Sequence, residues 1–472
     1  MAVRKDAPNL QLATYLDRLG WSPARLAHAL NAVLGPGYVA RTTVADWLAK
    51  GRIPRDPLPT VTAHVLANAL GAEVPLTQLW GPGARPSRTW VRSDHGLPPP
   101  TAPGATVETA TQWVTRDGGD MDRRNFLAVT GAALTGPAFT TATASPAPPV
   151  PTASLRGPLI TPAITDSIAA TVDAVRQLDD AEGGDRSTIR HIHGYFTLLA
   201  QYVRAGRFTT PATRTHTINL WAQLAQTAGW MAMDAGQHGL AQRYYRTGLT
   251  AAHASADPAL TSHVLGCMTY QAITLGRDRD AVALANAGIT AARSGPPAVR
   301  ALASARHAHA HAAIGDIHGM RHSTQEAQAH LTHPDAHATR PPWLYWLSDL
   351  KVVTGQTLIT AAFAGAPGAT RLLEEADPLI TPWLGTHAER TEDRDALLHG
   401  TWLARSYLRR DDLEQTLATA TSLLQYAATV RSAHVKAVLL DLEADLARRR
   451  DLHTHPDALE LRTRLKATAS PA

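Results

Sequence analysis

The sequence has little cysteine, few aromatic residues and no long apolar run, and each shortage excludes a class of protein. Cys267 is the single cysteine among 472 residues, which excludes an intrachain disulfide and any multi-cysteine metal site and predicts a reducing, cytoplasmic location. No apolar run of about 18 residues and no apolar signal core at the N-terminus occur, so we expect no leader and no stable membrane insertion. Aromatic residues make up only 6% of the chain, which favours packed helices over an all-β fold.

Sequence motifs of the common enzyme classes are also missing. The chain has no Walker loop, no Gly-x-Gly-x-x-Gly, no Gly-x-Ser-x-Gly elbow and no kinase signature. His307 and His311 would share one helical face, but no third ligand is evident, so we predict no metal site. Cys267 stands in an apolar stretch and is expected to be a buried, inert thiol. We therefore expect a protein that is not an enzyme, has no catalytic residues and needs no cofactor.

Positive charge is concentrated near the N-terminus. Residues 1–92 contain eleven Lys or Arg and five Asp or Glu, a net charge of +6, whereas the whole chain has a net charge of +5. The other residues together are therefore close to neutral. A compact basic segment attached to a neutral body indicates that one end of the chain meets a polyanion.

Composition divides the chain into three regions. Residues 1–92 carry periodic apolar patterns and form the first expected domain. Residues 93–158 hold ten of the 32 prolines and are expected to form a mostly extended linker. Residues 159–472 show helical periodicity with short Gly, Asp or Pro breaks, which is typical of an α-solenoid. The predicted fold class is all-α: an N-terminal helical bundle, a proline-rich linker and a C-terminal repeat array.

The breaks in the third region recur in a similar form. A glycine ends the first helix of each expected pair, and an alanine packs in the second helix. These features resemble tetratricopeptide repeats, although the spacings of 40 and 46 residues between Ala241, Ala281 and Ala327 exceed the roughly 34 of the ideal repeat. The segment "WLYWL" (343–347) is predicted to be core between two repeats, with an aromatic binding patch as the alternative. Repeat solenoids present a concave groove, and we expect this one to bind a peptide, a small ligand or a partner protein.

Three helices are predicted in the basic segment. The first spans about Leu10 to Leu19, and Ser22 followed by Pro23 offers an N-cap and a first helical residue for the second, "ARLAHALN". A short third helix, "RTTVADWL", begins at Arg41. Its expected inward residues are Val44, Trp47 and Leu48, and its expected outward residues are Arg41, Thr42, Thr43 and Asp46.

This division of faces is what a DNA recognition helix needs. Arginine can donate two hydrogen bonds to guanine in the major groove, and a threonine methyl group can contact the methyl group of thymine. We therefore predict base contacts from the four outward residues, Arg41, Thr42, Thr43 and Asp46. Side chains on either side of the helix are suited to phosphates. The predicted phosphate contacts are Ser22, Arg25, Lys50, Arg52 and Arg55.

The pieces "GWSPARLAHALN", "RTTVADWLAKGRIPRDP" and "LANALGAEVPLTQLW" together resemble the xenobiotic-response-element (XRE) type of helix-turn-helix. The resemblance covers about 75 residues and implies binding to a double-stranded DNA operator, as a homodimer. One departure is a connection of about ten residues, including Gly35-Pro36-Gly37, between the second and third helices, where the usual turn has three or four. The alternative is a small helical bundle that contacts proteins and has a basic, solvated face.

A twin-arginine-like motif lies in the linker, within residues 121–145. Arg123 and Arg124 precede Phe126 and Leu127, and a mildly apolar stretch follows, which resembles a twin-arginine export signal. Three explanations are open: an exported second product that starts at Met121, a contact with the membrane or export machinery, or a short amphipathic helix that docks on the repeat domain. The last is preferred.

The whole layout resembles actinobacterial regulators that join an XRE-type helix-turn-helix to tetratricopeptide-like repeats, with an Arg-Arg-x-Phe-Leu element between them. That group includes negative regulators of differentiation and antibiotic production. The resemblance implies a transcriptional regulator whose repeat domain senses a peptide, a small ligand or a partner protein. The alternative is a scaffold or adaptor that makes only protein contacts and associates with the membrane through the twin-arginine-like segment.

Overall fold

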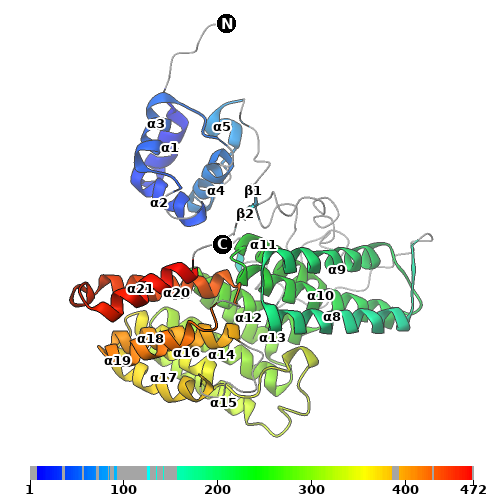
Figure 1. The fold of residues 1–472 in the computed structure, drawn as a ribbon. Coiled ribbons are helices and arrows are strands. Elements are labelled where there is room, and N and C mark those ends of the chain that lie inside the picture. Colours follow the sequence, from blue (N-terminus) through cyan, green and yellow to red (C-terminus); the bar gives the residue numbers. More distant parts are fainter. Residues whose placement is uncertain are drawn as a thin grey trace. The chain divides into compact units, whose positions relative to one another are not determined.

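The computed structural model is all-helical apart from two short pairs of parallel strands within the residues it describes (Figure 1). Contacts divide the chain into two units, the first made chiefly of Met1–His95 and Gly119–Gly131, the second containing the helices from Pro162 onward. The described residues are 8–34, 38–55, 58–70, 74–82, 84, 90–92, 125–127, 134–135, 142, 157–384, 393–427 and 430–469.

The described part of the first unit is a bundle of five helices. Their apolar faces enclose one core, in which Leu12, Leu26, Leu30, Val44 and Leu66 are fully buried, so the unit has the single hydrophobic centre that a small domain needs. The helices are α1 (Leu10–Leu19), α2 (Pro23–Leu34), α3 (Arg41–Lys50), α4 (Leu58–Leu70) and α5 (Leu76–Trp80).

The part of the twin-arginine-like segment that the structure describes is a strand. Strand β2 (Asn125–Leu127) pairs in parallel with β1 (Trp90–Arg92), and Phe126 lies in register with Val91. The expected amphipathic helix is therefore wrong for Phe126 and Leu127, because these residues form hydrogen bonds with another strand of the first unit. Arg123 and Arg124 lie outside the described residues.

The second unit is built from helices in sequential pairs, seven of them in the described part of the chain. The pairs are α8 (Pro162–Glu182) and α9 (Arg186–Ala205), α10 (Pro211–Asp234) and α11 (His238–Ala254), α12 (Pro258–Thr274) and α13 (Asp278–Ala292), α14 (Pro297–Ala313) and α15 (Ile317–Leu331), α16 (Lys351–Phe363) and α17 (Ala369–Leu384), α18 (Asp393–Arg409) and α19 (Leu413–Leu423), and α20 (Ala433–Arg448) and α21 (Pro456–Ala469). Strands β3 (Leu159–Ile160) and β4 (Arg207–Phe208) pair at the start of this unit.

Local sequence accounts for the helix ends. Asp and Thr side chains cap several N-termini ahead of a first-turn proline; at α12, Asp257 accepts a hydrogen bond from the Leu260 N–H and Pro258 follows it. Glycines after α10, α12 and α14 adopt positive φ angles of 75°, 63° and 72°, which other residues rarely adopt; these are Gly236, Gly276 and Gly315. The three alanines expected in the second helices, Ala241, Ala281 and Ala327, are buried in α11, α13 and α15.

The "WLYWL" segment lies between α15 and α16 and includes the 3₁₀ helix η1 (Pro342–Leu344). Trp343 stacks on His263 of α12 with ring centroids 4.7 Å apart, and Leu344 and Leu347 are buried. These three residues confirm the prediction of core. Tyr345 and Trp346 are exposed by 44% and 41%, so only one face of the segment packs inward.

The first helices of successive pairs pack on one another from α8 to α20, and α20 returns to contact α10. In Figure 1 the orange and red helices α18 and α20 therefore lie against the green start of the same unit. Asp234, at the end of α10, is central to this closure. Its carboxylate accepts hydrogen bonds from the Gly184 N–H (3.0 Å) and the Ser432 hydroxyl (2.5 Å), which join the α8–α9 turn to the N-cap of α20.

Arg394 of α18 adds a charged contact at the same place. Its Nη1 atom lies 3.2 Å from Oδ1 of Asp179 on α8 and 3.9 Å from Oδ2 of Asp234. All three side chains are largely buried, with 16%, 12% and 6% exposed. Burial raises the pKa of Asp179 to about 7, although the Arg394 guanidinium opposes that rise. The closing contact is thus a buried ion pair. Removing either partner would leave the other as an uncompensated buried charge.

Replacing Arg394 with Gln should therefore destabilise the second unit. We expect the free energy of unfolding at pH 8 to fall by about 3–5 kcal/mol, because Asp179 loses its cation in a buried site. Urea unfolding followed by circular dichroism measures this. The double variant Arg394→Gln/Asp179→Asn should recover part of the loss, and no recovery would contradict the ion-pair account.

The loss of stability in Arg394→Gln should also depend on pH. The folded-state pKa of Asp179, about 7, lies above its usual 3.8, so the folded protein keeps a proton there that the unfolded chain releases. The contribution of this group to stability is therefore present at acid pH and is lost as pH rises through about 7. The deficit of Arg394→Gln should be smaller at pH 5 than at pH 8. Equal deficits at both pH values would contradict this assignment.

Candidate nucleic-acid interface

Helix α3 has the two faces that its sequence predicts. Val44 and Trp47 are buried with 0% and 4% of their surface exposed, and Leu48 is half-buried. Arg41, Thr42 and Thr43 are exposed on the opposite side. The first turn of α3 has no side-chain cap, because residue 40 is alanine, so the positive end of the helix dipole faces solvent together with the Arg41 side chain.

Asn31 fixes the entry into α3. Its side-chain amide donates to the Val39 carbonyl oxygen (3.0 Å) and its side-chain oxygen accepts from the Val39 N–H (2.8 Å), as a neighbouring strand would. Helix α2 runs to Leu34, three residues beyond the predicted end, so residues 35–40 alone connect it to α3. The expected ten-residue connection is wrong because the helix continues to Leu34.

Further contacts anchor the far end of α3. The Asn9 N–H donates to the Leu48 carbonyl oxygen (2.9 Å), and the Asn9 side-chain amide donates to the Leu79 carbonyl oxygen (3.0 Å). Trp47 meets the ring of Trp80 edge to face at 5.8 Å, and the Trp80 indole N–H donates to the Pro59 carbonyl oxygen. Helix α3 is thus held by α1 and α5 as well as by α2, and its exposed face lies on a packed support.

Asp46 and Lys50, predicted to contact a base and a phosphate, contact each other. Lys50 Nζ lies 2.8 Å from Asp46 Oδ1 across one helical turn, and this hydrogen bond with Lys50 lowers the pKa of Asp46. Both side chains remain 41–55% exposed, and exposed pairs of this kind are weak. A ligand must compete with this pair, so Arg41, Thr42 and Thr43 are the more available residues of α3.

The other predicted phosphate contacts flank α3. Ser22 and Arg25 are exposed at the start of α2, where the Ser22 hydroxyl oxygen accepts from the Arg25 N–H (3.2 Å). The Arg25 guanidinium lies 5.8 Å from the centre of the Trp21 ring. Arg52 and Arg55 are exposed in the segment after α3. Along the chain, exposed arginines therefore precede α3 and follow it.

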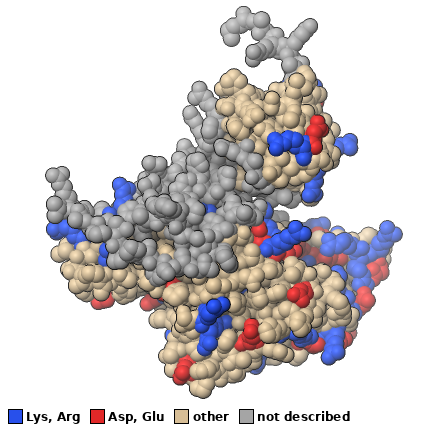
Figure 2. Space-filling model, turned by 180° about the vertical axis from the view of Figure 1, so that it is seen from behind, with Lys and Arg blue, Asp and Glu red and all other residues tan. Residues whose placement is uncertain are grey.

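Cations dominate this unit. Residues 8–84 contain six Lys or Arg and two Asp among those described, a net charge of +4. On the face of the first unit seen in Figure 2, Lys and Arg side chains predominate over acidic ones. A positive surface around an exposed helix face attracts phosphates by simple electrostatics.

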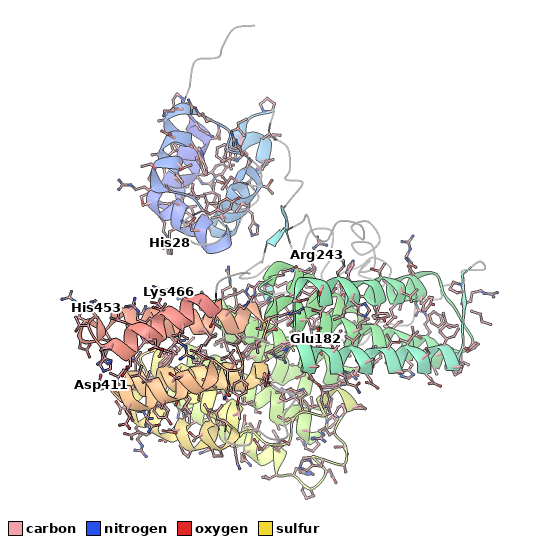
Figure 3. All side chains as sticks on the ribbon, in the orientation of Figure 1. His28, Glu182, Arg243, Asp411, His453 and Lys466 are labelled. Carbon is pink, nitrogen blue, oxygen red and sulfur yellow. The ribbon has the colours of Figure 1, made fainter. Side chains whose placement is uncertain are left out.

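Two residues near α3 were missed by the sequence reasoning. Asn31 positions α3 through Val39, and the signal was a polar residue among the apolar residues that end α2. Tyr38 stands two residues before α3 capping residue Ala40 and is 51% exposed, although large aromatic side chains are usually covered. His28, also exposed, projects from α2 (Figure 3).

Two candidates in the second unit have ordinary structural surroundings. Cys267 is buried, and burial raises the pKa of its thiol to about 11, so the thiolate nucleophile is disfavoured. His307 and His311 bring their Nε2 atoms to 3.2 Å. In the described parts of the chain, no three His, Cys, Asp or Glu side chains gather as a metal site requires. None of the helices described is both long and apolar enough to span a bilayer.

Comparison of the chain with models of protein families, with curated proteins and with solved structures finds no match.

The two hydrogen bonds between the Asn31 side chain and Val39 form a clamp, the Asn31 clamp. Removing it should loosen the start of α3. Asn31→Ala leaves the buried N–H and carbonyl groups of Val39 without partners, which costs about 1–3 kcal/mol. Hydrogen–deuterium exchange should become faster in peptides that cover residues 38–50. Thr42→Ala, a change on the exposed face, serves as the control and should leave exchange as in the unmodified chain. Unchanged exchange in Asn31→Ala would refute the clamp.

Proposed function

We propose that the protein is a DNA-binding transcriptional regulator whose first unit reads an operator with α3. The observation that carries the proposal is the two-faced α3, which exposes Arg41, Thr42 and Thr43 while Val44 and Trp47 lock it into the core. A recognition helix must keep its base-reading side chains free and its backbone fixed. The resemblance of about 75 residues of this unit to XRE-type domains supports the same function.

The roles of the residues follow from their chemistry. Arg41, in the first turn, donates two hydrogen bonds to the O6 and N7 atoms of a guanine, and the methyl groups of Thr42 and Thr43 suit thymine. Backbone N–H groups at the uncapped N-terminus of α3 donate to a phosphate oxygen. Ser22, Arg25, Arg52 and Arg55 hold the DNA backbone on either side and set the register. Lys50 and Asp46 contact the DNA only if its binding breaks the ion pair between them.

The second unit is proposed to sense a peptide, a small ligand or a partner protein. Many arrays of paired helices bind a peptide or a partner protein, and a regulator that acts as a homodimer responds when the ligand favours one arrangement of its two DNA-binding units. The layout resembles actinobacterial regulators with tetratricopeptide-like repeats. The competing proposal is an adaptor whose basic face is only solvated.

The role of Arg41 can be tested on an operator selected from random double-stranded DNA with the full chain. Arg41→Ala should weaken binding to that site by about 1–3 kcal/mol, because a two-bond contact with a base is lost. Arg18→Ala is the matched control, since it removes the same charge from an exposed position on α1. Fluorescence anisotropy at several salt concentrations measures both variants.

The two variants separate specific reading from general charge. We expect Arg18→Ala to bind the operator almost as well as the unmodified chain, and Arg41→Ala to lose its preference for the operator over random DNA. Equal losses in both would show that only net charge matters. If selection enriches no sequence and binding does not weaken with salt, the regulator is excluded and the adaptor is favoured.

A further inference from the structure

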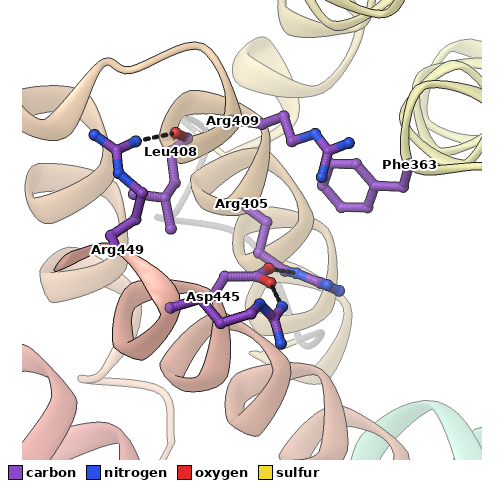
Figure 4. A pocket seen from close by; sticks show the side chains of 7 residues that line it. Phe363, Arg405, Leu408, Arg409, Asp445 and Arg449 are labelled. Atoms are coloured by element: carbon purple, nitrogen blue, oxygen red, sulfur yellow. Dashed lines mark hydrogen bonds and ion pairs between the residues drawn. The ribbon is translucent and has the colours of Figure 1, made fainter. Parts of the chain in front are cut away.

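A pocket rich in arginine lies in the second unit, where the C-terminal turns of α16, α18 and α20 meet (Figure 4). Its volume is about 430 Å³, within the range of small-molecule sites. Four guanidinium groups and one carboxylate line it. Three further carboxylates, those of Asp411, Asp441 and Asp451, pair with two of these arginines, Arg405 and Arg449. The lining residues are Phe363, Arg405, Leu408, Arg409, Asp445, Arg448 and Arg449.

Arg405 is the most firmly held of the four arginines. Its guanidinium lies over two neighbouring aromatic rings, 5.0 Å from the centre of Phe363 and 5.1 Å from that of Trp402. Its Nε donates to Asp445 (2.7 Å) and its Nη1 to Asp441 (3.2 Å), and only 11% of the side chain is exposed. A guanidinium fixed in this way is pre-organised, so a ligand that meets it orders no flexible side chain.

Arg409 and Arg448 complete the open side of the pocket. The Arg409 guanidinium lies 5.7 Å from the Phe363 ring, and it has no ion-pair partner in the parts of the chain that the structure describes. Arg448 pairs with Asp445, which it shares with Arg405, and its own side chain is 69% exposed. One carboxylate thus serves two guanidinium groups, and donor capacity toward the pocket is left over.

The simplest structural role for these arginines is to neutralise the negative ends of three helices. Arg449 does this, since it donates to the Leu408 carbonyl oxygen (3.4 Å) and pairs with Asp411 (2.6 Å), which Figure 3 labels in the turn after α18. Arg405, Arg409 and Arg448 donate to no helix carbonyl group in the described residues. Arg405 and Arg448 are held by ion pairs. Arg409 has neither a helix carbonyl partner nor an ion pair among the described residues, so helix capping does not explain its place beside the hollow.

We propose that this pocket binds a small organic phosphate that carries at least two negative charges. Planar guanidinium groups match phosphate oxygens in pairs of hydrogen bonds, and the exposed edge of Phe363 offers an apolar surface to the organic part. The volume fits a ligand of nucleotide size and excludes a folded partner. The idea that this phosphate is the signal sensed by the regulator rests on the proposed function. The binding of the phosphate to the pocket does not.

Calorimetric titration of the full chain with inorganic pyrophosphate at low ionic strength tests the site. Arg409→Gln/Arg448→Gln should weaken binding about a hundredfold, roughly tenfold for each charged hydrogen-bonding group removed. The matched control is Arg207→Gln/Arg293→Gln, which removes the same charge from exposed positions outside the pocket. It should bind pyrophosphate as tightly as the unmodified chain. Arg405 is left in place because it supports the packing of Phe363 and Trp402.

Each other result overturns the proposal in a distinct way. Absence of pyrophosphate binding shows that the arginines are structural, and equal weakening in the control shows that overall charge alone attracts the anion. Tighter binding of a tetraglutamate peptide than of pyrophosphate, abolished by the pocket variant, replaces the phosphate with an acidic peptide. Because no DNA is present, these results are independent of operator binding, which the pocket variant should retain in the absence of ligand.

Discussion

The contacts of Asp234 join the start and the end of the second unit, and the order of that unit depends on them. One carboxylate accepts from a backbone N–H at Gly184 and from the Ser432 hydroxyl that caps α20, and it lies near Arg394 of α18. Close approach is possible because residue 184 is glycine: a Cβ atom there would lie 1.9 Å from the Met231 carbonyl oxygen. The Asp234 carboxylate, the N-cap of α20 and the small residue at position 184 therefore depend on one another.

The interior that this closure creates is polar as well as tightly packed. The Tyr270 hydroxyl on α12 accepts from the Gln356 amide of α16 (3.2 Å) and lies 3.3 Å from Nε2 of His434 on α20. Burial lowers the pKa of His434 and that of His309, to about 3, so both imidazoles stay neutral at ordinary pH. Hydrogen-bonded neutral groups specify one arrangement of helices where apolar contacts alone would permit several.

Much of the fold could be predicted from the sequence, because it depends on local patterns. The helix ends at Gly236, Gly276 and Gly315, and the inward and outward faces of α3, follow from residues within a few turns of each other. The Asn31 clamp could not be found in this way, since its partner is an irregular residue. Nor could the pairing of Arg394 with Asp179, which are 215 positions apart, or strand β2, whose hydrogen bonds depend on a distant strand.

Closure of the second unit also limits how this protein can change in evolution. Open helical arrays gain or lose whole repeats because each repeat contacts only its neighbours. Here the first helices of non-adjacent pairs meet across the array, with α20 against α10. Duplication or deletion of a single helix pair would move Ser432 and Arg394 away from Asp234. The number of pairs is therefore fixed by geometry, and variation among relatives of this chain should fall in the turns.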